Sequence, residues 1–178
     1  MDTDFFLEKI NNQAKDYYSS TIDTSIEESK NLNWLLGLAG GALIFSFNNH
    51  DKVVISENPL ILIQSIIFVL IIVIGYAHRE AIKRFKNDTL AVIRMLDFLK
   101  FEFQLVPNEI EYDIEHGFFD EIYLDYMDGE YFQEESSEKF ELLMHSRYRN
   151  FRIYGTLRII SILLIIMQFS CYFISILR

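Results

Sequence analysis

Residues 159–177 read IISILLIIMQFSCYFISIL, a run of 19 residues without a charged side chain. A helix of that length extends for about 28 Å, close to the thickness of the hydrocarbon layer of a bilayer. Residues 59–77 form a second uncharged stretch of 19 residues. Residues 32–47 form a third, less apolar stretch with four small residues in a row, from Ala39 to Ala42. The sequence therefore predicts an integral membrane protein with three transmembrane helices.

The rest of the chain is too short for more than one small domain in water. The chain has 178 residues, 51% of them hydrophobic, and the three spans take up a large share. The remainder is near the lower size limit for a self-sufficient core, so we expect a partner subunit to complete its packing. Cys171 is the single cysteine, which excludes a disulfide framework within one chain. The predicted fold class is an all-α membrane protein with helical extensions and a small acidic insert.

The distribution of basic residues predicts the orientation of the spans. Fourteen of the 16 Lys and Arg residues fall on one side, and only Lys52 and Arg178 fall on the other. Basic residues accumulate on the cytoplasmic side of membrane proteins. We therefore expect a cytoplasmic N-terminus, an outer loop at residues 48–58 and an outer C-terminus.

The apolar stretches and the distribution of charged residues predict four segments along the chain. Residues 1–31 form an N-terminal amphipathic helix, and residues 32–77 form a transmembrane hairpin with spans at 32–47 and 59–77. Residues 78–157 form a cytoplasmic acidic domain, in which residues 102–138 hold thirteen Asp and Glu and no Lys or Arg. Residues 158–178 contain the last span.

A heptad pattern continues the second span into the cytoplasm. The spacing alternates between three and four residues, which is typical of a helix seam that packs against other helices. This predicts one helix that continues to about residue 105 and is ended by Pro107. The seam packs either on the chain's own last helix or on another subunit. Its residues are Ile82, Phe85, Thr89, Val92, Leu96, Leu99 and Phe103.

The acidic segment leaves two folds open. Residues 110–114 alternate as a strand would, and Asp128-Gly129 lies between aromatic runs as a hairpin turn would. A compact helical hairpin fits the same residues. A helix is expected again from Ser136, continuing into the last span.

Motifs of common enzymes are absent from the sequence. It contains no phosphate-binding glycine loop, no HExxH and no Gly-x-Ser-x-Gly, and its four histidines are scattered. The acidic run lacks the fixed spacing of a calcium loop. We therefore expect no metal and no cofactor, and a solvated acidic face.

The first span has the composition of a helix that packs closely. Gly37 and Gly41 form a small-xxx-small pair, which lets helix backbones approach one another. Gln64 and Gln168 are single amides in the other two spans, where polar groups meet one another or face water. We expect the first span to line or frame the centre of a homo-oligomer. The predicted pore-lining or interface residues are Gly37, Gly41, Asn48, Asn49, His50, Asp51 and Gln64.

One short motif precedes the last span. Residues 149–154 read RNFRIY and resemble the Arg-x4-His motif of HEPN-domain ribonucleases. The resemblance makes Arg149, Asn150 and Tyr154 the weak catalytic candidates. Tyr154 stands where the family has its histidine, and a phenol with a pKa near 10 is a poor general base at neutral pH. The arginines also fit a cytoplasmic anchor beside a membrane span.

The layout of the chain resembles two groups of small bacterial antiphage membrane effectors. One is the pore-forming accessory membrane protein of type VI-B CRISPR loci, which carries a divergent HEPN motif. The other is the Pycsar transmembrane effector, with two early spans, a cytoplasmic insert and a last span after a basic-aromatic stretch such as residues 147–149. The resemblance implies residence in the bacterial inner membrane, homo-oligomers, and an RNA-guided nuclease or its signal as a further partner.

These observations leave several functions open. The first is an oligomeric pore or membrane-perturbing effector that depolarises the membrane and enhances interference, without direct nucleic-acid binding. The alternatives are a membrane-tethered divergent HEPN ribonuclease, an effector triggered by a cyclic nucleotide, and a non-catalytic anchor subunit.

Overall fold

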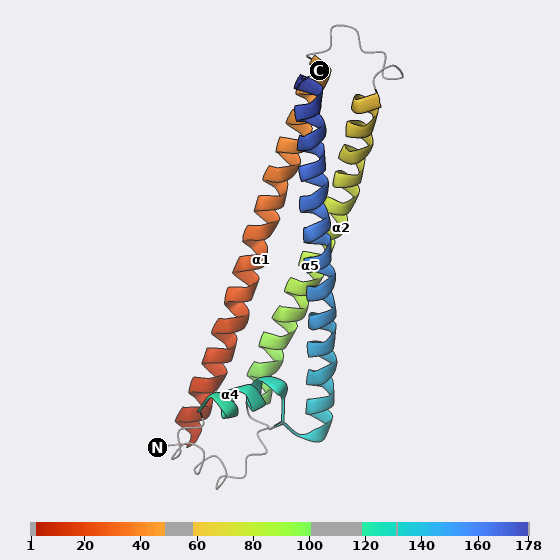
Figure 1. The fold of residues 1–178 in the computed structure, drawn as a ribbon. Helices are drawn as coiled ribbons and strands as arrows, with labels where there is room; N and C mark the ends of the chain where they lie inside the picture. Colours follow the sequence, from red (N-terminus) through yellow and green to blue (C-terminus); the bar gives the residue numbers. More distant parts are fainter. Residues whose placement is uncertain (1–2, 49–58, 101–118, 131, 178) are drawn as a thin grey trace. The chain divides into compact units, whose positions relative to one another are not determined.

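The described part of the chain is helical throughout apart from its turns. The computed structural model describes residues 3–48, 59–100, 119–130 and 132–177. These residues form α1 (Thr3–Asn48), α2 (Pro59–Leu99), α4 (Phe119–Asp128) and α5 (Glu134–Leu177), in the order shown in Figure 1. The all-α fold class is thus confirmed for these ranges. Residues 49–51, Phe103 and the possible strand at 110–114 lie outside them.

The chain divides into two compact units. Unit 1 comprises Met1–Thr24 and Arg84–Arg149, and unit 2 comprises Ser25–Lys83 and Asn150–Arg178. Each of the three long helices contributes to both units. α2 continues past the apolar stretch as predicted, but it ends at Leu99 and not near residue 105.

The core of unit 1 forms where apolar stripes of four helices meet. On α1 the buried stripe recurs every four residues, which keeps its members on one face of a helix. The predicted seam residues Val92, Leu96 and Leu99 of α2 are buried in this same core, against their own chain. The buried cluster consists of Ile10, Ala14, Tyr18, Val92, Leu96, Leu99, Ile122, Tyr126, Phe132 and Phe140.

Two buried tyrosines supply the polar contacts of this core. The Tyr126 hydroxyl donates to Asn11 Oδ1 at 3.0 Å, and the Tyr18 hydroxyl donates to Met144 Sδ at 3.6 Å. Burial raises the pKa of the Tyr18 phenol to about 12, although the nearby Arg147 opposes the shift. Burial also raises the pKa of Tyr126. Both phenols therefore stay neutral well above physiological pH.

Arg147 is held against this core by aromatic rings. Its guanidinium carbon lies 4.8 Å from the Tyr18 ring centroid and 5.2 Å from that of Phe85. Its Nε donates to Thr89 Oγ1 at 3.3 Å. Phe85 and Thr89, two further seam residues, are buried by these contacts. Arg147, the first residue of the basic-aromatic stretch at 147–149, thus serves the packing of unit 1.

The segment around Gly129 ends a helix and is not the turn of a β-hairpin. Gly129 has φ +84°, and its N–H donates to Tyr126 O while Glu130 N–H donates to Asp125 O. This bonding pattern is the Schellman motif, which ends a helix at a residue with left-handed conformation. A Cβ on Gly129 would lie 2.8 Å from Phe140 Cδ1. Only glycine meets both requirements, so the Asp128-Gly129 pair marks the end of α4 (Phe119–Asp128).

Unit 2 consists of three helical segments packed through apolar and small residues. One buried cluster joins Ala39, Ile67, Ile71 and Ile165, and a second joins Ala81, Ile82 and Tyr154, which includes the first seam residue. Close approach of α1 and α2 depends on glycines. A Cβ on Gly40 would meet the Phe68 ring at 3.4 Å, and one on Gly75 would meet Leu36 at 3.4 Å.

Two of these helices are long and apolar enough to cross a membrane, by length and composition. In their most apolar stretches only 28% of the residues of α2 and 17% of those of α5 are buried. The core helix of a soluble protein is mostly buried, so this exposure favours membrane helices.

The described helices therefore provide two such spans and not the three predicted. α1 does not meet the same criterion. Its stretch at residues 32–47 is only 16 residues long and includes Asn33 and the glycines at 37, 40 and 41. Glycine and asparagine contribute little hydrophobic transfer energy, so the composition that suits α1 for close packing weakens it as an independent span.

Candidate functional site

Unit 2 has polar groups inside and apolar groups outside. Ser46, Gln64, Ser161 and Gln168 are at most 2% exposed, and His78 is 3% exposed. Large apolar residues on the same helices are about half exposed, among them Ile66, Val69, Val73, Leu163 and Ile166. A protein in water shows the opposite distribution. In a membrane, buried polar groups are costly and mark functional positions.

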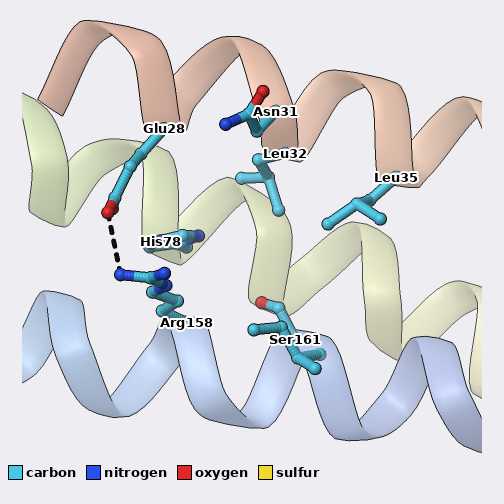
Figure 2. A pocket seen from close by; sticks show the side chains of 8 residues that line it. Glu28, Asn31, Leu32, Leu35, His78, Arg158 and Ser161 are labelled. Atoms are coloured by element: carbon cyan, nitrogen blue, oxygen red, sulfur yellow. Dashed lines mark hydrogen bonds and ion pairs between the residues drawn. The ribbon is translucent and has the colours of Figure 1, made fainter. Parts of the chain in front are cut away.

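Two of these groups, His78 and Ser161, line a cavity of about 120 Å³ (Figure 2). All three helical segments contribute to its wall: α1 with four residues, α2 with His78, and α5 with three. The lining residues are Glu28, Asn31, Leu32, Leu35, His78, Arg158, Ser161 and Ile162.

The cavity lies where each helix changes from charged to apolar sequence. On α1, Lys30 is the last charge before residues 32–47. On α2, His78 directly follows the uncharged stretch 59–77, and on α5, Arg158 directly precedes the stretch 159–177. Three helices therefore make this transition around one cavity, which defines a common boundary level within unit 2.

An ion pair joins two residues of the cavity wall. Arg158 Nη1 donates to Glu28 Oε1 at 2.8 Å, and Figure 2 shows the pair linking α1 to α5. The Arg158 side chain is 53% exposed and that of Glu28 is 19% exposed. An arginine this exposed contributes little to stability through the pair.

Three side chains at the cavity have buried polar atoms without a partner. Glu28 Oε2, both imidazole nitrogens of His78 and Ser161 Oγ make no hydrogen bond within the described residues. The His78 ring stacks on Tyr154, with the ring centroids 5.3 Å apart and the planes at 15°. Leaving such groups unpaired costs about 1–3 kcal/mol each. These three cavity residues were not predicted from the sequence, in which His78, at the end of an apolar stretch, gave the only local signal.

The residues of the HEPN-like motif do not share one environment. Arg149 is exposed, whereas Asn150 is 8% exposed and Tyr154 is 6% exposed. Tyr154 belongs to the buried cluster with Ala81 and Ile82. Its phenol ring therefore serves the packing of unit 2 and the stacking on His78.

Gln64 lies inside the unit and not on its surface. It is fully buried, like Gln168, and none of the four side-chain amide atoms has a hydrogen-bond partner in the described structure. The antiparallel contact of Ile67 and Ile71 with Ile165 places Gln64 and Gln168 at one level, each one helical turn beyond the apolar cluster. Gln64 therefore faces its own chain, unlike the predicted interface glycines.

Gly37 and Gly41 lie on an open face of α1. Both are exposed, and a Cβ on either would meet nothing within 4 Å. A shallow groove of about 400 Å³ lies there, lined by Asn33, Trp34, Gly37 and Leu38. Trp34 is 75% exposed. Asn48, at the end of α1, is exposed as well, while the other polar residues of the predicted outer end lie outside the described ranges.

Within the described residues, no group of three or more His, Cys, Asp or Glu could hold a metal ion. The comparisons with known proteins add no relative. No protein-family model, curated protein or solved structure matches this chain. The geometry of unit 2 therefore carries the functional argument.

Proposed function

We propose that this chain is an integral membrane protein that assembles into a homo-oligomer around α1 and acts as a pore or membrane-perturbing effector. The observation that carries the proposal is the inverted distribution in unit 2, with an exposed apolar surface around a polar interior. Such a surface needs lipid or further protein to cover it. The antiviral, CRISPR-type setting rests on the resemblance in layout alone, as does the bacterial inner membrane.

The third span belongs to this proposal. One face of α1 packs on its neighbours along the apolar part, through Leu35, Leu36 and Ala39 and up to the Phe45–Tyr172 ring pair at 5.8 Å. A helix of weak hydropathy can cross a bilayer when its neighbours cover part of it. We therefore propose that α1 crosses together with α2 and α5, with a cytoplasmic N-terminus and an outer C-terminus.

The open face of α1 supports self-association. Gly40 and Gly75 are used within the chain, whereas Gly37 and Gly41 are not. Small residues one turn apart allow two backbones to approach closely. The exposed Trp34 beside them adds a large ring that needs cover. A second copy of α1 would supply a matching surface.

Catalysis is no part of the proposal. In the packing described above, the ring of Tyr154 is stacked on His78 and buried, and its phenol is a poor base at neutral pH. Arg149→Ala should therefore leave the activity of the protein in cells unchanged. Cleavage of RNA by the purified protein that is lost in Arg149→Ala would contradict this and favour the nuclease.

The glycine face gives a direct test of the effector. Gly37→Leu and Gly41→Leu should leave the protomer intact, because each added side chain enters open space. They should nevertheless lower the oligomer mass in mild detergent and abolish membrane depolarisation, read with a potential-sensitive dye in cells challenged with phage. Gly155→Leu is the matched control, since its Cβ also meets nothing within 4 Å.

Three outcomes separate the parts of the proposal. Extraction of the protein from membranes by alkaline carbonate would refute membrane insertion. A mass of one 21.1 kDa chain plus detergent would refute self-association. Unchanged depolarisation in both glycine variants would mean that α1 does not form the conduit, and the anchor subunit would become the better interpretation.

A further inference from the structure

The cavity at Glu28, His78, Arg158 and Ser161 has the features of a ligand site. Its wall contains two side chains, His78 and Ser161, that are at least 97% buried and whose polar atoms have no partner in the described structure. Its volume of about 120 Å³ has room for several waters or one small polar headgroup. The residues that carry these unpaired groups all line this space.

The charges at the cavity are paired and opposite. Arg158 uses Nη1 for Glu28 Oε1, and a guanidinium carries five N–H donors in all. Glu28 keeps a second oxygen, Oε2, which accepts no hydrogen bond in the described structure. The site thus offers a carboxylate oxygen to a donor and a guanidinium edge to an acceptor, a few ångströms apart.

This pairing selects the class of guest. The Glu28 carboxylate would repel a simple anion, and the Arg158 guanidinium would repel a simple cation. A guest that carries one charge of each sign matches both groups without adding net charge. Leu32, Leu35 and Ile162 form the apolar part of the wall and lie on the apolar side of the boundary level, where acyl chains would begin.

We propose that this cavity binds the headgroup of a zwitterionic phospholipid with a primary ammonium, such as phosphatidylethanolamine. The ammonium donates to Glu28 Oε2, and the phosphate accepts from Arg158. His78 and Ser161 complete the polar wall. This inference rests on the proposed membrane insertion of unit 2, because a lipid ligand has access only there.

The ammonium separates this proposal from general lipid contact. Ethanolamine has three N–H donors, whereas the quaternary nitrogen of choline has none and cannot satisfy Glu28 Oε2. Phosphatidylglycerol keeps the phosphate for Arg158 but has no cation for Glu28. The site should therefore rank ethanolamine above both choline and glycerol headgroups.

The test compares lipids with identical acyl chains on the full-length protein. Purified protein in mild detergent is incubated with equal amounts of the ethanolamine, choline and glycerol lipids, and native mass spectrometry reports the bound fraction of each. We expect the ethanolamine lipid to bind roughly tenfold tighter than the choline lipid, as a charge-assisted hydrogen bond implies. Glu28→Gln should remove that preference. Glu135→Gln, which breaks the exposed Glu135–Lys139 pair of unit 1, should keep it.

Each other outcome decides against the site. Equal binding of ethanolamine and choline lipids, or tighter binding of the glycerol lipid, would overturn the proposed headgroup site. This comparison uses the native chain, so it does not depend on whether a variant folds. Full displacement by an equal concentration of soluble glycerophosphoethanolamine would mean that the apolar wall contributes nothing and the ligand is no lipid. Protein removed from membranes by carbonate would overturn the proposed function too, whereas inserted protein without lipid preference overturns only the headgroup site.

Discussion

Replacing Gly129 with alanine should destabilise unit 1 severely. At φ +84°, an L-residue with a Cβ costs about 1–2 kcal/mol relative to glycine. The added carbon would also lie 2.8 Å from Phe140 Cδ1 and 3.3 Å from Phe132 Cδ2. Both rings are buried in the core of unit 1, and overpacking of this kind costs about 1–3 kcal/mol. The loss should therefore total about 2–5 kcal/mol.

The assay is thermal unfolding in mild detergent, with the near-ultraviolet circular dichroism signal as the readout. The core of unit 1 contains Tyr18, Tyr126, Phe132 and Phe140, so its packing contributes to this signal. With a loss of 2 kcal/mol or more, the midpoint of the unit 1 transition should fall by at least about 8 °C.

The chain offers a matched control with the opposite sign. Gly155 lies inside helix α5 with nothing within 4 Å of its Cβ position, so Gly155→Ala should stabilise the protein by about 0.5–1 kcal/mol. Equal midpoints for Gly129→Ala and the native chain would refute the role assigned to this turn.

Three further predictions follow from the buried polar groups and the orientation. The pKa of Tyr18 is about 12 in the folded protein and near 10 in the unfolded chain, so the free energy of unfolding is unaffected by this group below pH 10 and falls as the pH rises from 10 to 12. Tyr18→Phe removes this loss, which reaches about 3 kcal/mol at pH 12, and should therefore shift the alkaline unfolding of unit 1 to higher pH. An unshifted alkaline transition would show that Tyr18 does not limit stability. Gln64→Leu and Gln168→Leu each remove an unpaired buried amide and should stabilise unit 2 by about 1–2 kcal/mol in detergent unfolding, whereas a loss in both single variants would indicate that the amides bond to each other. In intact cells, an outside thiol reagent should label a cysteine at position 50 and not one at position 120 on a Cys171→Ser background, and the reverse pattern would overturn the orientation.

The sequence was sufficient for features that depend on one helix. The heptad at Val92, Leu96 and Leu99 predicts a long helix with the correct buried face, because periodicity along one helix encodes that face. The uncharged stretch that begins at Pro59 predicts a helix but not which of its faces lies inside. The end of α4 (Phe119–Asp128) at Gly129 was marked by the same local chemistry, although the sequence left a β-hairpin open.

Features that depend on several helices could not be predicted. Gln64 was predicted among the residues that line a pore or an interface, and it is buried in its own unit. A helix that is apolar on all sides has no stripe to distinguish its inner face. The cavity was missed because Glu28, His78 and Arg158 are far apart in sequence and none belongs to a motif. Only the antiparallel register, seen in the His78–Tyr154 stack, brings them together.

The close packing of α1 on α2 has a consequence for biosynthesis. α1 leaves the ribosome first, but its apolar part is the least able to partition into lipid alone. Its contacts with α2, such as Leu36 beside Gly75 and Gly40 beside Phe68, become available only after α2 has been translated. If α1 crosses as proposed, we expect it to wait at the translocon and enter the bilayer with α2 as a hairpin. Truncated chains released from the ribosome that end before residue 59 should remain accessible to protease, and chains that include α2 should become protected over residues 32–47 and 59–77.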